Sequence, residues 1–161
     1  MKRIFNFSAG PATMPAAVLE TAQRELLNFD SSGMSIIEMS HRSKTFEDVL
    51  NRAKSGIISL LNVPDNYEVL FIQGGASLQF SMLAQNLFQK DLPALAINTG
   101  SWTKKAIKEI KKEGACNIIA SSEDKNFSYL PDLAKCSYDN SSFTYLCSNN
   151  TIFGTQFKTF P

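Results

Sequence analysis

YEVLFIQGGASLQF, residues 67–80, joins a strand-like run to the beginning of a helix. Its apolar part, Val69–Ile72, is short and continuous, and the pair Gly74–Gly75 ends it at once. Such a run predicts a strand buried on both faces of a sheet. Apolar residues then recur at helical spacing, which predicts a helix over about residues 76–89. We therefore expect a strand, a tight glycine turn and a helix in succession.

The glycine turn of this stretch is suited to an anion. The first turn of a helix leaves backbone N–H groups unpaired and carries partial positive charge, while glycine lets a ligand approach the backbone closely. Gly74-Gly75-Ala76-Ser77 therefore predicts a phosphate-binding turn at the helix start. The alternative is an ordinary turn in which Ser77 caps the helix. The stretch matches neither the G-x-x-x-x-G-K-[ST] nor the G-x-G-x-x-G nucleotide pattern.

The rest of the chain alternates helical and strand-like segments. Helices are predicted after Pro15 and after Ser43, and a lysine-rich helix is predicted after Trp102. Further strands are predicted at residues 94–98, 116–120 and 142–147. This alternation is typical of an α/β fold with a mostly parallel sheet flanked by helices, in which ligands bind at the carboxyl ends of the strands.

Length, charge and cysteine content predict a soluble protein with no nucleic-acid partner, disulfide framework or metal site. The chain has 161 residues, with 16 basic and 15 acidic side chains, and its lysine cluster alternates with apolar residues as on a solvated helix face. We therefore expect no nucleic-acid partner. Its three cysteines form no C-x-x-C pair, which favours reduced thiols over a disulfide framework or a metal site. Because no apolar run approaches the length of a membrane span, we expect a soluble, cytoplasmic protein.

Polar and aromatic side chains follow three of the predicted strands. The stretches are Gln73–Ser77, Asn98–Trp102 and Ser148–Thr151, and in a parallel sheet all three can face one crevice. Together they offer amide donors for an anion, one large aromatic plate, and hydroxyl and amide groups. This set suits a flat ring that bears a phosphate. The alternatives are a packed helix-start residue for Trp102 and an ordinary turn residue for Thr151.

Six motifs along the chain together resemble the phosphoserine aminotransferase family, class-V members of the fold-type-I pyridoxal-phosphate enzymes. None of the motifs would suffice alone, but their combination, order and spacing are specific. They are FNFSAGPA at 5–12, SHRSK at 40–44, LNVP at 61–64, GGASLQF at 74–80, GSW at 100–102 and NNTIFG at 149–154. The resemblance implies that the chain is the amino-terminal half of the large domain of that fold.

The resemblance also implies a cofactor, pyridoxal 5′-phosphate, and the residues that hold it. Ala76 and Ser77 would bind its phosphate at the helix start. Trp102 would stack on its pyridine ring, and Thr151 would hydrogen-bond near its ring hydroxyl. The cofactor is the electron sink of such enzymes, while protein groups supply orientation and proton transfer.

On the substrate side, the resemblance implies a reversible amino transfer between glutamate and 3-phosphohydroxypyruvate, which gives 2-oxoglutarate and O-phosphoserine. A phosphorylated hydroxythreonine is a second substrate of the family. Arg42 would grip a carboxylate or phosphate with its planar fork of donors, His41 would assist, and Ala9 and Gly10 would line the substrate side. Sites of this group lie at a dimer interface, so we expect a homodimer.

The resemblance identifies no catalytic residue within this chain. The Schiff-base lysine and the carboxylate at the pyridine nitrogen, both needed for this chemistry, would lie beyond Pro161. We expect residues 1–14 to form an amino-terminal segment near the substrate site, and residues 15–161 to form the first part of the large domain. We also expect the chain by itself not to transaminate.

Two other interpretations remain. The first is another fold-type-I enzyme, such as a cysteine desulfurase or an alanine-glyoxylate type transaminase, against which the motifs at 5–12 and 40–44 argue. The second is a non-catalytic α/β module that binds a phosphorylated ligand, an interpretation that the absent lysine permits.

Overall fold

The computed structural model describes residues 3–8 and 10–160. The chain divides into two compact units, residues 1–71 and 72–161, which are described separately below. This division reflects contacts within the present chain. The expected boundary between residues 1–14 and 15–161 concerns the domains of the family, and it stays a prediction.

The first unit contains two α-helices joined by short turns. Helix α1 spans Ala16–Glu25 with Pro15 directly before it, and helix α2 spans Lys44–Leu61. Two 3₁₀ turns lie between them, η1 at Phe29–Ser31 and η2 at Ile36–Glu38. As predicted, Ser43 caps α2, because its side-chain oxygen accepts a hydrogen bond from the backbone N–H of Phe46.

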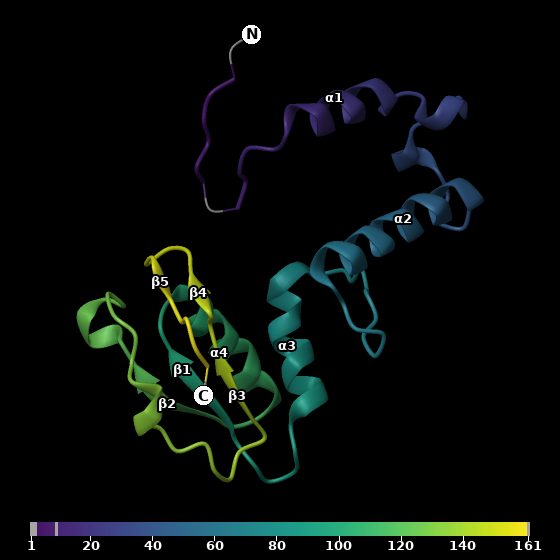
Figure 1. The fold of residues 1–161 in the computed structure, drawn as a ribbon. Helices are drawn as coiled ribbons and strands as arrows, with labels where there is room; N and C mark the ends of the chain where they lie inside the picture. Colours follow the sequence, from purple (N-terminus) through teal and green to yellow (C-terminus); the bar gives the residue numbers. More distant parts are fainter. Residues whose placement is uncertain (1–2, 9, 161) are drawn as a thin grey trace. The chain divides into compact units, whose positions relative to one another are not determined.

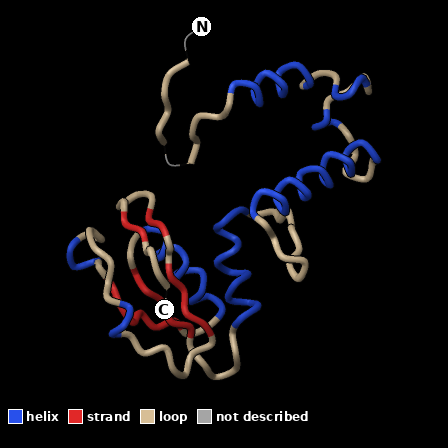
Figure 2. Tube along the Cα trace, viewed as in Figure 1, coloured by secondary structure: helices blue, strands red, loops and turns tan. Residues whose placement is uncertain are grey.

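The second unit is built on a three-stranded parallel sheet in the order β2-β1-β3 (Figures 1 and 2). The strands are β1 at Ala94–Asn98, β2 at Cys116–Ser121 and β3 at Phe143–Leu146. These are the three strands predicted for residues 94–98, 116–120 and 142–147. Every residue of β1 is buried because it lies between the other two strands. The predicted α/β class with a mostly parallel sheet is confirmed.

Two helices pack together against this sheet. Helix α3 spans Gly75–Leu87, close to the prediction of 76–89, and the lysine-rich helix α4 spans Ser101–Glu113. Small and branched residues fill the space between helices and strands, and four larger apolar side chains surround them. The core residues are Ala84, Ala94, Ala96, Ala106, Ile107, Ile110 and Cys116, with Phe80, Phe88, Phe143 and Tyr145 at its margin.

The remaining elements of the second unit are short. Two 3₁₀ turns lie between β2 and β3, η3 at Glu123–Lys125 and η4 at Leu133–Lys135. After β3, a small antiparallel hairpin pairs β4, Asn149–Asn150, with β5, Thr155–Gln156. The hairpin was not predicted, because two-residue strands are too short to show an alternating pattern.

The strand predicted at Val69–Ile72 is wrong. These residues form no regular structure, and the side chains of Leu70, Phe71 and Ile72 are 65%, 57% and 49% exposed. A buried strand needs neighbours whose backbone groups pair with its own, and no strand among the described residues pairs with this run. The glycine turn and helix predicted to follow it are present. No helix within the described ranges is both long and apolar enough to cross a membrane.

Candidate functional site

Trp102 and Thr151 meet at the carboxyl ends of the parallel strands. Trp102 lies in the first turn of α4, which follows β1, and its side chain is half-buried. Thr151 lies in the turn between β4 and β5, shortly after β3. The indole Nε1 of Trp102 donates a hydrogen bond to the hydroxyl oxygen of Thr151 at 3.2 Å. The structure therefore brings together two of the three strand ends compared in the sequence.

A second set of contacts, centred on Asn150, joins the same two loops. The Nδ2 of Asn150 donates to the hydroxyl oxygen of Thr99, at the end of β1, and to that of Thr155 in β5. The backbone oxygen of Asn150 accepts a hydrogen bond from the N–H of Gly154, which closes the hairpin turn. Sequence reasoning did not single out Asn150. The signals for it were its place next to Thr151 after a predicted strand and its place in the NNTIFG motif at 149–154.

The positively charged ammonium group of Lys105 lies over the indole of Trp102. The Nζ of Lys105 is 4.6 Å from the centroid of the indole rings, which is the geometry of a cation–π contact. Lys105 is exposed, as are the other lysines of α4. The predicted solvated lysine face is therefore confirmed, with one lysine of that face also touching the candidate site.

The start of α3 presents free backbone N–H groups. Gly74 precedes the helix in a left-handed conformation, with φ of 90°, and no side chain caps the first turn. Ser77 is therefore not a cap of this helix. Ala76 and Ser77 are exposed in that first turn, where their N–H groups have no backbone acceptor within the described part of the chain.

Two aromatic contacts establish which end of the sheet this helix start faces. Phe80, early in α3, packs edge-on against Tyr145, late in β3, with centroids 5.9 Å apart. Phe88, just after α3, packs against Phe143 at the beginning of β3, at 5.3 Å. Helix and strand thus run in opposite directions. The first turn of α3 consequently points toward the carboxyl ends of the strands, where Trp102 and Thr151 lie.

These groups fit a flat ring that bears a phosphate. A Cβ built on Gly74 would lie 2.5 Å from the Cβ of Leu78, so the turn leaves no room for a side chain there, whereas a Cβ on Gly75 would meet no atom within 4 Å. Uncapped N–H groups at a helix start bind phosphate. The half-buried indole of Trp102 offers an aromatic surface, and the Thr151 hydroxyl still has its hydrogen to donate, because it only accepts from Trp102.

Three of the four predicted substrate residues, Gly10, His41 and Arg42, lie in the described part of the first unit, and Gly10 is exposed. His41 and Arg42 are exposed in the turn before α2, where the N–H of Arg42 donates to the Ser40 hydroxyl at 3.3 Å and the N–H of Ser43 donates to the Ser40 carbonyl at 2.9 Å. Arg42 forms no ion pair with any residue that the structure describes. Ala9 lies outside the described residues.

Tyr145, in β3, and Cys147, just after it, are not activated for nucleophilic attack. Burial raises the pKa of the Cys147 thiol, which keeps it protonated and weakly nucleophilic. Burial, with a smaller contribution from Cys147, raises the pKa of Tyr145 to about 12. Within the described ranges, no group of three or more His, Cys, Asp or Glu side chains is arranged to hold a metal ion.

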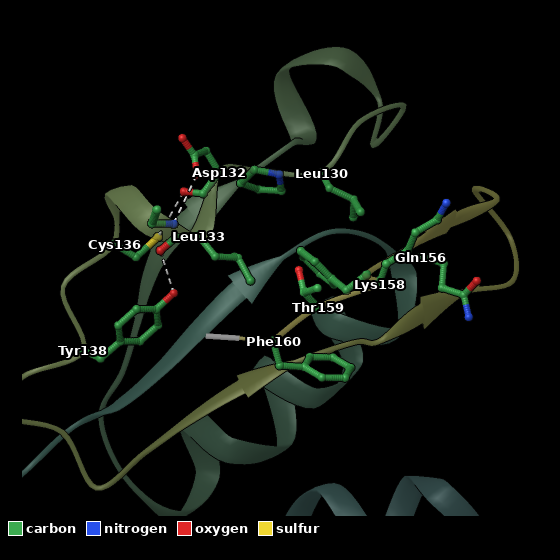
Figure 3. A pocket seen from close by; sticks show the side chains of 12 residues that line it. Leu130, Asp132, Leu133, Cys136, Tyr138, Gln156, Lys158, Thr159 and Phe160 are labelled. Carbon is green, nitrogen blue, oxygen red and sulfur yellow. Dashed lines mark hydrogen bonds between the residues drawn. The ribbon is translucent and has the colours of Figure 1, made fainter.

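A separate hollow of about 660 Å³ lies away from these residues (Figure 3). Its walls are formed by residues 130–134, 136, 138 and 156–160, and the Tyr138 hydroxyl donates to the Leu133 carbonyl at 2.9 Å. None of the predicted site residues lines it. The candidate site is therefore an open surface at the strand ends and not this hollow.

Comparison with known proteins relates the whole chain to one group of enzymes. The family described as Aminotransferase class-V matches residues 4–160. The phosphoserine aminotransferase of Geobacillus kaustophilus is 51% identical over 100% of this chain and 45% of its own length. The solved phosphoserine aminotransferase from Bacillus circulans subsp. alkalophilus superposes with a TM-score of 0.89 at 48% identity, covering 99% of this chain and 44% of that one.

A pyridoxal-phosphate-bound phosphoserine aminotransferase from Trichomonas vaginalis also superposes, with a TM-score of 0.86 at 37% identity, covering 99% of this chain and 45% of that one. The chain thus spans less than half the length of these relatives.

Proposed function

Because this chain belongs to the class-V aminotransferase family, we propose that it supplies the cofactor-holding part of a phosphoserine aminotransferase. The reaction is the reversible transfer of an amino group between L-glutamate and 3-phosphohydroxypyruvate, giving O-phospho-L-serine and 2-oxoglutarate, and a phosphorylated hydroxythreonine is a second substrate. The names of the relatives support this proposal. It places the parent enzyme in serine and pyridoxine biosynthesis, in the cytoplasm.

In this proposal pyridoxal 5′-phosphate, when bound, acts as the electron sink for the amino transfer. The N–H groups of Ala76 and Ser77 hold its phosphate at the start of α3. Trp102 lies against its ring, and the Thr151 hydroxyl donates toward the ring oxygen. The hydrogen bond from Trp102 to Thr151 is the observation that carries the proposal, because it holds an aromatic surface and a hydroxyl donor together at the strand ends.

The substrate side of the proposal rests on Arg42, His41 and Ala9. A guanidinium binds carboxylate and phosphate groups through two parallel N–H donors, and Arg42 has no described acidic partner that would compete for them. His41 lies beside it in the same exposed turn, ready to share the anionic group. The expected substrates are small anionic molecules, and neither nucleic acid nor a membrane is a partner.

A homodimer is part of the same proposal. The first unit exposes large apolar side chains, with Phe5, Phe7 and Leu27 at 85%, 91% and 85% exposure. Surface of this kind is typical of protein–protein contacts when it forms contiguous patches. A second copy of the parent enzyme is the partner that we propose for it.

Binding of pyridoxamine 5′-phosphate tests the cofactor part of the proposal. This compound carries the ring and the phosphate but no aldehyde, so it cannot react with the exposed lysines. Trp102 is the single tryptophan of the sequence, and its fluorescence therefore reports on the site alone. We expect saturable quenching by pyridoxamine 5′-phosphate and much weaker quenching by pyridoxamine, which lacks the phosphate. Equal quenching by both compounds, or none by either, would contradict the proposal.

A coupled assay of glutamate consumption tests the expected inactivity of the chain alone. The reaction needs a lysine that is held at the cofactor and kept from solvent. Every described lysine is exposed except Lys54, which is half-buried and paired with Glu68. We therefore expect no turnover above that of free pyridoxal 5′-phosphate. Enzymatic turnover by the 161-residue chain would show that one of these lysines serves after all.

A further inference from the structure

Asn150 is almost completely buried, and its side chain links β4 to two other segments. Its exposed fraction is 1%, and its Nδ2 donates at 3.2 Å to Thr99 and at 3.1 Å to Thr155. Thr99 directly follows β1 and lies 51 residues earlier in the chain, while Thr155 belongs to the opposite strand of the hairpin. A buried amide with two hydrogen bonds of this kind holds the end of β1 and the hairpin in one arrangement.

Gly100 shows how closely the two loops approach. A Cβ built on Gly100 would lie 2.8 Å from the Oδ1 of Asn150 and 2.9 Å from the Cδ2 of Phe153. The backbone at Gly100, just before α4, is therefore in direct contact with the side-chain amide of Asn150. No protein donor within the described residues reaches this Oδ1, although it is buried. Such an unpaired buried oxygen costs free energy, so the two hydrogen bonds of the Asn150 Nδ2 are made at the expense of its Oδ1.

Asn150 and its partner Thr99 lie close in the sequence to the two residues of the candidate site. Thr151 follows Asn150 directly, and Trp102 lies two residues after Gly100 and three after Thr99. The indole and the hydroxyl can meet at 3.2 Å only if the start of α4 and the turn after β4 keep their separation. The hydrogen bond from Asn150 to Thr99 fixes that separation, because both of its side chains are buried while Thr151 is exposed.

We propose that Asn150 is the positioning residue of the site: it aligns the Trp102 indole with the Thr151 hydroxyl, and through them the ring of the bound cofactor. Asn150 is not placed in contact with the cofactor. The alignment of Trp102 with Thr151 follows from the contacts above. Only the last step, the effect on the cofactor ring, rests on the proposed function.

Fluorescence of the single tryptophan tests the alignment without any ligand. In Asn150→Ala both side-chain hydrogen bonds are lost, so we expect the Trp102 emission to shift to longer wavelength and acrylamide to quench it more strongly. The affinity for pyridoxamine 5′-phosphate should fall about tenfold, the equivalent of about 1.4 kcal/mol. A folded Asn150→Ala chain with the parent emission and quenching would overturn the proposal.

Ser142→Ala is the matched control. Ser142 also joins loops by its side chain, since it accepts from the N–H of Gln89 and donates to the carbonyl of Leu92, both at 2.9 Å, but at the amino end of β3. Its loss should lower the urea midpoint of unfolding and leave the Trp102 emission unchanged. If Ser142→Ala moved the emission as far as Asn150→Ala, general loosening would explain both, and the proposal would fail.

Two further results separate the possible failures. If circular dichroism shows that Asn150→Ala does not fold, Thr155→Val is the deciding variant, because it removes one of the two hydrogen bonds of Asn150. It should shift the Trp102 emission in the same direction by a smaller amount. An unchanged emission in Thr155→Val would refute the alignment. If the parent chain shows no saturable binding of pyridoxamine 5′-phosphate, the proposed function fails, while the emission of the variants still decides the role of Asn150.

Discussion

The indole nitrogen of Trp102 lies 3.2 Å from the hydroxyl oxygen of Thr151, and 49 residues of chain separate the two. Trp102 lies in the first turn of α4, after the central strand, and Thr151 lies in the turn of the β4–β5 hairpin. The hydrogen bond satisfies the only donor of the indole and so restricts the orientation of its ring. An aromatic surface with a fixed orientation is what a flat ligand needs if it is to bind in a single pose.

Replacement of Thr151 by valine should make the Trp102 side chain more mobile, because its hydrogen bond to Thr151 is lost. Valine keeps the branched shape but removes the hydroxyl, so Trp102 loses its acceptor at a cost of about 0.5–1.5 kcal/mol. We expect longer-wavelength tryptophan emission and weaker binding of pyridoxamine 5′-phosphate, measured by fluorescence titration. Thr151→Ser retains the hydroxyl and is the matched control. Should valine and serine behave alike, the hydroxyl would have no part in the site.

Replacement of Gly74 by alanine should damage the start of α3. The added Cβ would lie 2.5 Å from the Cβ of Leu78, and the residue would have to adopt a φ of 90°. Strain of this kind costs about 1–3 kcal/mol. We expect a lower urea midpoint and a loss of the preference for pyridoxamine 5′-phosphate over pyridoxamine, because the N–H groups of Ala76 and Ser77 are displaced.

Gly56→Ala is the control for this substitution. Gly56 lies inside α2, and a Cβ there would meet no atom within 4 Å. Alanine in a helix interior is more stable than glycine by about 0.5–1 kcal/mol. The control should therefore raise the urea midpoint or leave it unchanged. A Gly74→Ala chain as stable as Gly56→Ala would mean that the turn before α3 tolerates a side chain.

Local signals in the sequence were sufficient for most of the helices and strands. Ser43 before a polar-apolar repeat indicates a helix start, and Gly74–Gly75 indicate a break, because both effects depend on neighbouring residues alone. The continuous apolar run at residues 94–98 predicts a fully buried strand, and β1 is one. The outcome differs at Val69–Ile72, where the same pattern occurs but no described strand pairs with it.

The site was predictable in its residue types but not in its connections. Trp102 and Thr151 were proposed because each follows a predicted strand, and parallel strands place such ends together. Asn150 was missed, since its partner Thr99 is 51 residues away and nothing local distinguishes a buried asparagine from a turn asparagine. Burial and hydrogen-bond partners are properties of the folded chain.

Loss of the Ser43 cap should weaken the beginning of α2 and the turn that carries Arg42. Its side-chain oxygen accepts from the N–H of Phe46 at 3.3 Å, and replacement of such a cap by alanine costs about 1 kcal/mol. We expect faster hydrogen exchange at the N–H groups of Phe46 and Glu47 in Ser43→Ala. Ser55→Ala, inside the same helix and exposed, should leave these rates unchanged. Equal rates in both variants would exclude a role for the cap.

Stability should fall in alkaline solution because of Tyr145. Burial, with a smaller contribution from Cys147, raises the pKa of Tyr145 from 10.0 to about 12 in the folded chain. Between these values the unfolded chain has lost the proton that the folded chain keeps, so this contribution is complete below pH 10 and disappears toward pH 12. The free energy of unfolding can be measured with urea across this pH range for the parent and for Tyr145→Phe, whose ring still packs against Phe80. We expect it to fall less steeply with pH in the variant than in the parent. The control is Tyr67→Phe, at a side chain that is 67% exposed, and its free energy of unfolding should fall with pH as steeply as that of the parent. The same dependence on pH in all three chains would show that Tyr145 does not contribute to the loss of stability.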